Sequence, residues 1–325
     1  MVNKVDPYQL QFTVYQLLWA VVPPLLLLAY YYRRVFSKPP LLQLLLCFGV
    51  GALSGFVALG LEWGFEHLAN QWVNWDRITR SLPGVALRQI VEVGAIEEGC
   101  KLGGVMLFVY SDRLPRIHTI SRLSTIFMLT LAIALGFTAQ ENWIYLSNDM
   151  AFVSDRAIGT PVHAMFSAPW GYALARNRRL IAAWVNAVIC HALVNIFSTS
   201  PRYPPPLHFL SYGLFPFLLW MFWRLEGLLR RVQRKPPIIL ISGLTPIHRY
   251  WQLGLVLFAL MLGGNALLGF FLLARILTPL SLSQLFYPDI LWFIFSRSLG
   301  NLIPGLLAWG IYRYLRYWAR RKYSG

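Results

Sequence analysis

The residues of this chain best suited to chemistry lie between positions 97 and 195, inside stretches otherwise apolar enough to be membrane helices. Each is a carboxylate, a cation, an imidazole or an amide: Glu97, Glu98, Lys101, Glu141, Asn142, His163, His191 and Asn195. Arg88 and Glu92 add further charge to the first of these stretches. A charged side chain at the centre of a bilayer costs roughly 3 kcal/mol on insertion scales. Such a density of charge therefore indicates a functional site.

The first group has the composition of a general base. On a helix, Glu97 lies over Lys101 four residues later, and Glu98 lies at the edge of the same lysine. Two carboxylates this close in a low-dielectric setting cannot both ionise cheaply, so one is expected to exchange a proton with water near neutral pH. A structural ion pair that locks helix packing is the alternative interpretation, and this motif alone does not separate the two.

The second group is able to stabilise an oxyanion or bind a metal. His191 and Asn195 are four residues apart, so both side chains face one way on a helix. They can donate hydrogen bonds to a developing oxyanion, or the histidine can ligate a metal with the amide behind it. Interhelical hydrogen bonding is favoured for this pair taken alone. Taken singly, His163 is interpreted as a residue at the membrane interface. Glu141 with Tyr145 is interpreted as a pair with a capping or packing role.

The expected depth of these residues favours a shared site over scattered structural pairs. At a rise of about 1.5 Å per residue, Glu97, Glu141, His163 and His191 all fall between mid-membrane and the outer face. Polar groups from four helices at one level indicate a water-accessible cavity that opens outward.

Composition places the chain in the membrane. Of its 325 residues, 57% are hydrophobic and only 13% are charged, and the mean hydropathy is +0.52. The net charge of +16 lies in short loops between apolar runs, as membrane topology requires, so nucleic acid is discounted as a partner. Cys47, Cys100 and Cys190 each lie in an apolar run, which makes a disulfide framework improbable.

These features predict an all-α polytopic fold of about nine transmembrane helices. The predicted spans are residues 13–32, 41–62, 84–110, 123–146, 160–175, 180–199, 209–223, 253–275 and 290–312. Helices three to six hold nearly all the ionisable residues and should form a polar catalytic core. The predicted organisation is an N-terminal pair of helices with an outer loop at 1–83, the core at 84–199, a seventh helix and basic cytoplasmic connector at 200–252, and a two-helix appendage at 253–325.

The basic residues predict the orientation. Most Lys and Arg fall in alternate loops, at 33–38, 113–122, 176–179, 224–249 and 313–322, and such loops face the cytoplasm. The N terminus is therefore predicted outside and the C terminus in the cytoplasm. The first apolar run lacks a small-residue cleavage site, so we interpret it as a retained helix and not a signal peptide. A prokaryotic plasma membrane is the expected location.

Four motifs together resemble the PrsW family of intramembrane proteases. They are E-E-x-x-K at 97–101, G-F-x-x-x-E-N-x-x-Y at 136–145, H-x7-G at 163–171 and H-x-x-x-D/N at 191–195. Their order and spacing agree, and the resemblance covers predicted spans three to six. The CAAX prenyl protease and Abi family is more distantly similar. The terminal helices and the long stretch after position 199 are not covered.

The resemblance implies a polytopic protease that cleaves membrane-anchored proteins, with anti-sigma factors as the best-known bacterial substrates. By analogy with the more distant family, Glu97 would be the general base, with Glu98 and Lys101 tuning it; the motif itself leaves open which of the two glutamates is the base. His163 would help to hold the attacking water, and His191 with Asn195 would form the oxyanion site. Glu141 completes the candidate catalytic set.

A zinc centre remains an alternative mechanism, because one glutamate and two histidines make a sufficient ligand set, here Glu98, His163 and His191. Asn195 stands where some relatives have Asp, which favours an amide donor over a carboxylate ligand. The hypothesis from a different class is a non-enzymatic transporter or scaffold that uses the buried charges for packing or proton relay.

Overall fold

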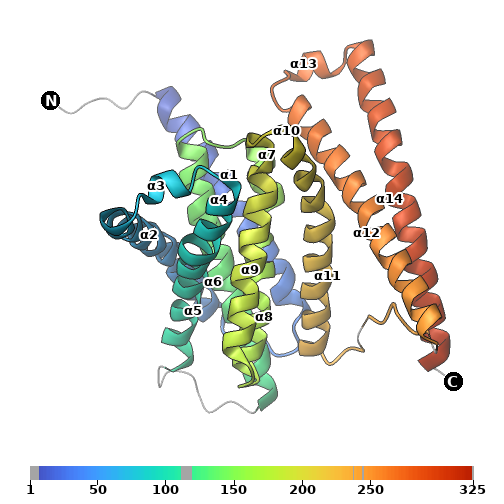
Figure 1. The fold of residues 1–325 in the computed structure, drawn as a ribbon, viewed down its shortest axis with the longest axis horizontal. Coiled ribbons are helices and arrows are strands. Elements are labelled where there is room, and N and C mark those ends of the chain that lie inside the picture. The colour runs from blue at the N-terminus through green and yellow to red at the C-terminus, as the bar shows by residue number, and fades with distance from the viewer. Residues whose placement is uncertain (1–6, 111–118, 237, 244, 324–325) are drawn as a thin grey trace. The chain divides into compact units, whose positions relative to one another are not determined.

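The computed structural model describes residues 7–110, 119–236, 238–243 and 245–323 (Figure 1). The basic loop predicted at 113–122 lies largely outside these residues. The described chain is helical, and no strand occurs in it. It divides into two compact units, Met1–Ile196 with Arg231–Arg234, and Phe197–Arg230 with Lys235–Gly325.

The first unit contains the long helices of the chain's N-terminal part and all the candidate site residues. Its elements are α1 (Pro7–Arg34), α2 (Leu41–Trp72), α3 (Trp75–Ile78), α4 (Leu82–Arg88), a π-helix (Gln89–Val93), α5 (Gly94–Val109), α6 (Thr119–Ser147), α7 (Val153–Gly159), α8 (Val162–Ala175) and most of α9 (Leu180–Thr199).

Helix α6 forms the centre of the first unit. It packs against α1, α2, α5 and α8, and its apolar side chains from Ile126 to Leu135 are buried. Two glycines allow α2 and α6 to approach closely, because a Cβ on Gly51 would collide with the backbone of Ile133, and one on Gly136 with the backbone of Phe48. The buried α6 thereby positions Asn142, which is buried, and Glu141, which is partly buried.

We expect Gly136→Ala to destabilise the protein by about 1–3 kcal/mol, because the added methyl group has no space between two packed backbones. Gly49→Ala is the matched control, since a Cβ at Gly49 meets nothing within 4 Å. The control should be neutral or slightly stabilising, as alanine is the better helix former. Thermal unfolding of both variants in detergent measures the difference, and equal midpoints would contradict the close approach.

The predicted third span, residues 84–110, is built from three segments. Helix α4 and helix α5 are joined by the π-helix Gln89–Val93, which begins eight residues before Glu97 along the chain. π-Helical turns inside α-helices are frequent at functional sites because they rotate the side chains that follow. Helix α5 then carries Glu97, Glu98 and Lys101 on buried positions.

The second unit contains the C-terminal helices. Its elements are two 3₁₀ turns (Ser200–Arg202 and Phe209–Gly213), α10 (Pro205–His208), α11 (Leu214–Val232, up to Arg230 in this unit), α12 (Pro246–Leu277), α13 (Leu282–Leu285) and α14 (Pro288–Tyr323). Helices α12 and α14 pack against each other. The predicted connector extended to residue 252, but α12 already begins at Pro246, since Thr245 caps it by accepting a hydrogen bond from the amide of His248 at 3.3 Å.

The all-α membrane fold is confirmed. Six helices among the described residues are long and apolar enough to cross a membrane, and they correspond to predicted spans one, two, four, six, eight and nine. The count of nine stays a prediction for three reasons. Span three is interrupted by the π-helix, α8 has 14 residues, and α11 carries four charged residues, Arg224, Glu226, Arg230 and Arg231. A 14-residue helix is about 21 Å long, less than the roughly 30 Å of a bilayer core.

Candidate active site

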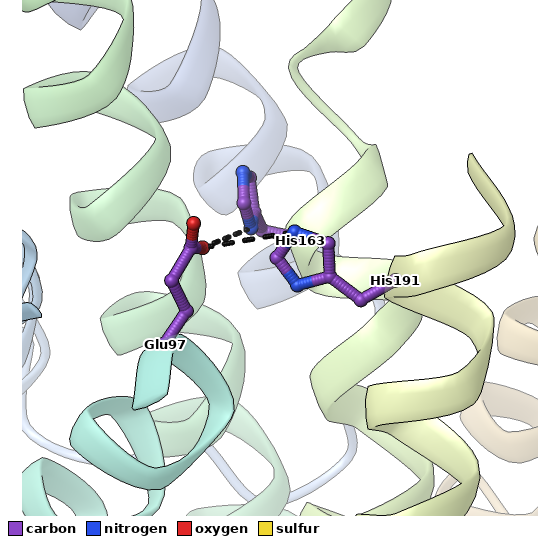
Figure 2. Close-up of side chains that lie close together, drawn as sticks. All are labelled: Glu97, His163 and His191. Atoms are coloured by element: carbon purple, nitrogen blue, oxygen red, sulfur yellow. Dashed lines mark ion pairs between the residues drawn. The ribbon is translucent and has the colours of Figure 1, made fainter. Parts of the chain in front are cut away.

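Glu97 lies between two histidines that come from different helices (Figure 2). Its Oε2 atom is 3.8 Å from Nδ1 of His163 on α8 and 3.8 Å from Nε2 of His191 on α9. One ligand atom from each of the three residues lies within 4.8 Å of the others, and all three residues are buried. The described residues thus gather one carboxylate and two imidazoles at a single point.

Each histidine also faces a second carboxylate with its other ring nitrogen. His163 Nε2 is 2.7 Å from Glu141 Oε2, and His191 Nδ1 is 3.7 Å from Glu98 Oε1. The hydrogen bond to Glu141 fixes the ring orientation and the tautomer of His163, whereas His191 Nδ1 has no hydrogen-bond partner among the described residues. The arrangement therefore directs both rings towards Glu97.

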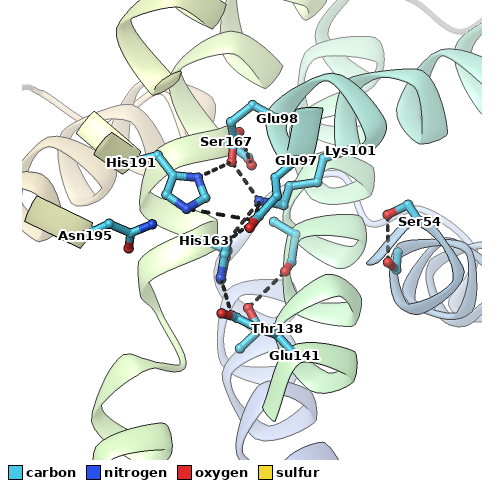
Figure 3. Close-up of polar contacts among 12 residues, drawn as sticks. Ser54, Glu97, Glu98, Lys101, Thr138, Glu141, His163, Ser167, His191 and Asn195 are labelled. Atoms are coloured by element: carbon cyan, nitrogen blue, oxygen red, sulfur yellow. Dashed lines mark hydrogen bonds and ion pairs between the residues drawn. The ribbon is translucent and has the colours of Figure 1, made fainter. Parts of the chain in front are cut away.

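Lys101 connects the two adjacent carboxylates to His163 (Figure 3). Its fully buried ammonium lies 3.2 Å from Glu97 Oε2, 2.8 Å from Glu98 Oε1 and 2.9 Å from His163 Nδ1. It also lies over the ring of Phe137, 4.0 Å from the centroid. The predicted pairing of one lysine with two carboxylates is present in the structure, with a histidine as an additional neighbour.

Glu98 accepts more hydrogen bonds from protein donors than Glu97 does. Besides Lys101, its Oε2 accepts hydrogen bonds from the Ser167 hydroxyl at 3.0 Å and the Trp170 indole at 2.9 Å. The sequence-based metal set contained Glu98, whereas the structure gathers Glu97 with His163 and His191. The difference arises because protein donors already occupy both Glu98 oxygens, while Glu97 Oε2 faces the two imidazoles.

Asn195 has a partner outside this group. Its Nδ2 donates a hydrogen bond to Oε1 of Gln89 in the π-helix, at 2.6 Å. This contact joins α9 to the segment that precedes α5, so Asn195 helps to hold His191 and Glu97 in register. The sequence carried no signal for Gln89, because a single glutamine in an apolar stretch has many partners available.

Arg88 and Glu92 belong to a separate cluster. Glu92 is fully buried and accepts hydrogen bonds from the Trp75 indole at 2.7 Å and from Arg88 Nε at 3.0 Å, while Arg88 also pairs with Glu66. These groups satisfy one another around the π-helix. Their charges, which contributed to the density seen in the sequence, are paired within this cluster.

Arg156 is the site residue that the motifs did not identify. It lies on α7, between α6 and α8, and its guanidinium contacts Glu141, Asn142 and Tyr145. The available signal was its position in a loop that the predicted topology places outside, where basic residues are depleted.

A helical membrane protein with a buried carboxylate between two oriented imidazoles has the side chains of an intramembrane hydrolase. The sequence model of the PrsW family, described as intramembrane metalloproteases, matches residues 39–221, more than half of the 325-residue chain. The chain belongs to the PrsW family, as its four motifs predicted, and is an integral, multi-pass membrane protein of the peptidase class. No curated protein and no solved structure matches it.

Proposed function

We propose that this protein is an endopeptidase that cleaves membrane-anchored protein substrates at the centre formed by Glu97, His163 and His191. The observation that carries the proposal is the convergence of these three side chains, from α5, α8 and α9, at one buried point. Anti-sigma-factor-like proteins are the substrate class that the family suggests. Under the predicted topology, with the N terminus outside and the C terminus in the cytoplasm, cleavage takes place in the outer half of the bilayer.

Zinc fits this centre by the types of its donors, and the Lys101 ammonium, which contacts His163 Nδ1 at 2.9 Å and Glu97 Oε2 at 3.2 Å, would move aside for the metal. One carboxylate and two imidazoles, with a fourth position left for water, is a ligand set of catalytic zinc sites. Glu141, hydrogen-bonded to His163, supplies an outer-shell contact of the kind such sites use, and Glu98 lies 3.7 Å from the other histidine, His191. Bound there, zinc would make water a strong nucleophile at neutral pH and polarise the scissile carbonyl.

The remaining polar residues would support the reaction. Lys101 would neutralise the negative charges of Glu97 and Glu98. Its ammonium lies close enough to Glu97 to follow changes in the charge of that carboxylate during the reaction. The hydrogen bond that Asn195 donates to Gln89 is proposed to hold Asn195 at the edge of the centre. A mechanism with Glu97 alone as general base, with His163 holding the water and His191 with Asn195 as the oxyanion site, uses the same residues without the metal.

The test is cleavage of a panel of single-pass membrane proteins by the purified protein in liposomes, comparing wild type with His191→Ala and with a zinc chelator. We expect wild type to cleave at least one substrate, and both the variant and the chelator to reduce cleavage by about 10³-fold or more. Zinc added back should restore the chelated wild type and not the variant.

Two other outcomes separate the alternatives. Cleavage that survives the chelator but not His191→Ala would replace the zinc mechanism with the glutamate-activated water. A folded wild type that cleaves no substrate, even with zinc, while a family relative cleaves the same panel would favour the non-enzymatic hypothesis. Native mass spectrometry measures the metal content in each case, and thermal unfolding confirms folding.

A further inference from the structure

We propose that Arg156 is a positioning residue of this centre, acting through Glu141 to fix the tautomer and orientation of His163. The inference rests on the proposed function for its catalytic consequence, although its structural part does not. Arg156 lies on the short helix α7, outside the four family motifs, and its side chain is 16% exposed.

The guanidinium bridges two adjacent residues of α6. Its Nη2 donates to Glu141 Oε2 at 2.8 Å and its Nε donates to Asn142 Oδ1 at 2.7 Å. The same group lies over the ring of Tyr145, 4.5 Å from the centroid. The three polar residues of the E-N-x-x-Y motif therefore converge on one arginine. Its planar fork suits two parallel acceptors, a geometry that lysine does not reproduce.

The next contact links this pair to the centre. Glu141 Oε2, which accepts from Arg156, also lies 2.7 Å from His163 Nε2. A carboxylate only accepts hydrogen bonds, so Nε2 must carry the proton. On the other side of the ring, Nδ1 lies 2.9 Å from the Lys101 ammonium, which only donates. The two neighbours thus fix His163 as the Nε2–H tautomer, with the Nδ1 lone pair on the side of Glu97.

Arg156 also balances charge. Glu97, Glu98 and Glu141 bring three carboxylates to the centre, against the two cations Lys101 and Arg156. Without Arg156, the partly buried Glu141 would lose the contact that holds its carboxylate in place, so it could turn away from His163 Nε2 and release the ring from one tautomer.

The experiment compares wild type with Arg156→Gln and Arg156→Lys, using Arg77→Gln as the matched control because Arg77 is an exposed arginine of the same unit. The direct readout is the ¹⁵N NMR spectrum of histidine-labelled protein, with His163 assigned by its absence in His163→Asn. We expect one Nε2–H tautomer for His163 in wild type and in Arg77→Gln. A mixture or the reverse tautomer is expected in Arg156→Gln, with Arg156→Lys intermediate.

The functional readouts are affinity for Zn²⁺, measured by competition with a chromophoric chelator, and the kcat and KM of cleavage. We expect Arg156→Gln to weaken Zn²⁺ binding about 10- to 100-fold and to lower kcat with little change in KM. If Arg156 acts through Glu141, the double variant with Glu141→Gln should bind Zn²⁺ no more weakly than Glu141→Gln alone.

An unchanged tautomer in a folded Arg156→Gln would overturn the proposal, as would additive losses in the double variant. A wild type that neither binds Zn²⁺ nor cleaves would instead refute the proposed function, while the tautomer measurement would still decide the role of Arg156. Thermal unfolding of each variant separates loss of positioning from loss of folding.

Discussion

Glu97→Gln is expected to abolish cleavage, by about 10³-fold or more, while leaving the protein folded and inserted. The substitution keeps the shape of the side chain but removes the negative charge that faces His163 and His191. A general base contributes up to about 10⁴-fold, and loss of a metal ligand adds to this. Folding should survive because the amide oxygen can still accept the hydrogen bond from Lys101. The measurement is cleavage rate together with the unfolding midpoint in detergent.

Glu98→Gln provides the contrast. Glu98 is fully buried and accepts from Lys101, Ser167 and Trp170, so its substitution should lower stability more than Glu97→Gln does. A stable Glu98→Gln variant with no activity, beside an active Glu97→Gln variant, would reverse the roles assigned to the two carboxylates. Asp149→Asn, at an exposed carboxylate of the same unit, serves as the neutral control.

Lys101→Met is expected to produce the largest loss of stability among single substitutions in the site, about 3–5 kcal/mol. Methionine fills the space beside Phe137, but the buried carboxylates of Glu97 and Glu98 lose their shared cation. Removing one partner of a buried ion pair leaves an uncompensated charge, which costs more than the pair itself contributes. The free energy of unfolding is measured by denaturant titration in mixed micelles.

Combining Lys101→Met with Glu98→Gln tests the reason for this loss. Removing one negative charge together with the cation should recover part of the stability, since the imbalance is reduced. Lys38→Met, at an exposed lysine, controls for the loss of a lysine as such and should leave the midpoint unchanged. No recovery in the double variant would mean that Lys101 stabilises the protein through packing and not through charge.

The sequence determined the membrane class and the helices of the fold. Apolar runs are set by composition, so each predicted span coincides with helical structure, and the E-E-x-x-K spacing placed Lys101 beside both glutamates because a helix brings residues three and four apart together. The sequence did not reveal the π-helix Gln89–Val93. The extra residue rotates the side chains that follow, but a five-residue turn is too short to show a periodicity of its own in the sequence.

What only the tertiary structure decided is which carboxylate faces the histidines and what holds them. Glu97 and Glu98 are neighbours of one type, and helical geometry alone gives each a similar distance to Lys101. Ser167 and Trp170 of α8 occupy Glu98, which leaves Glu97 facing His163 and His191.

The partners Gln89 of Asn195 and Arg156 of Glu141 were likewise decided by packing, since each contact joins residues far apart in the chain or in different helices. Local sequence fixes which side chains share the face of one helix, because that follows from 3.6 residues per turn. Contacts between helices depend on how the helices rotate and approach one another, and no single helix encodes that arrangement.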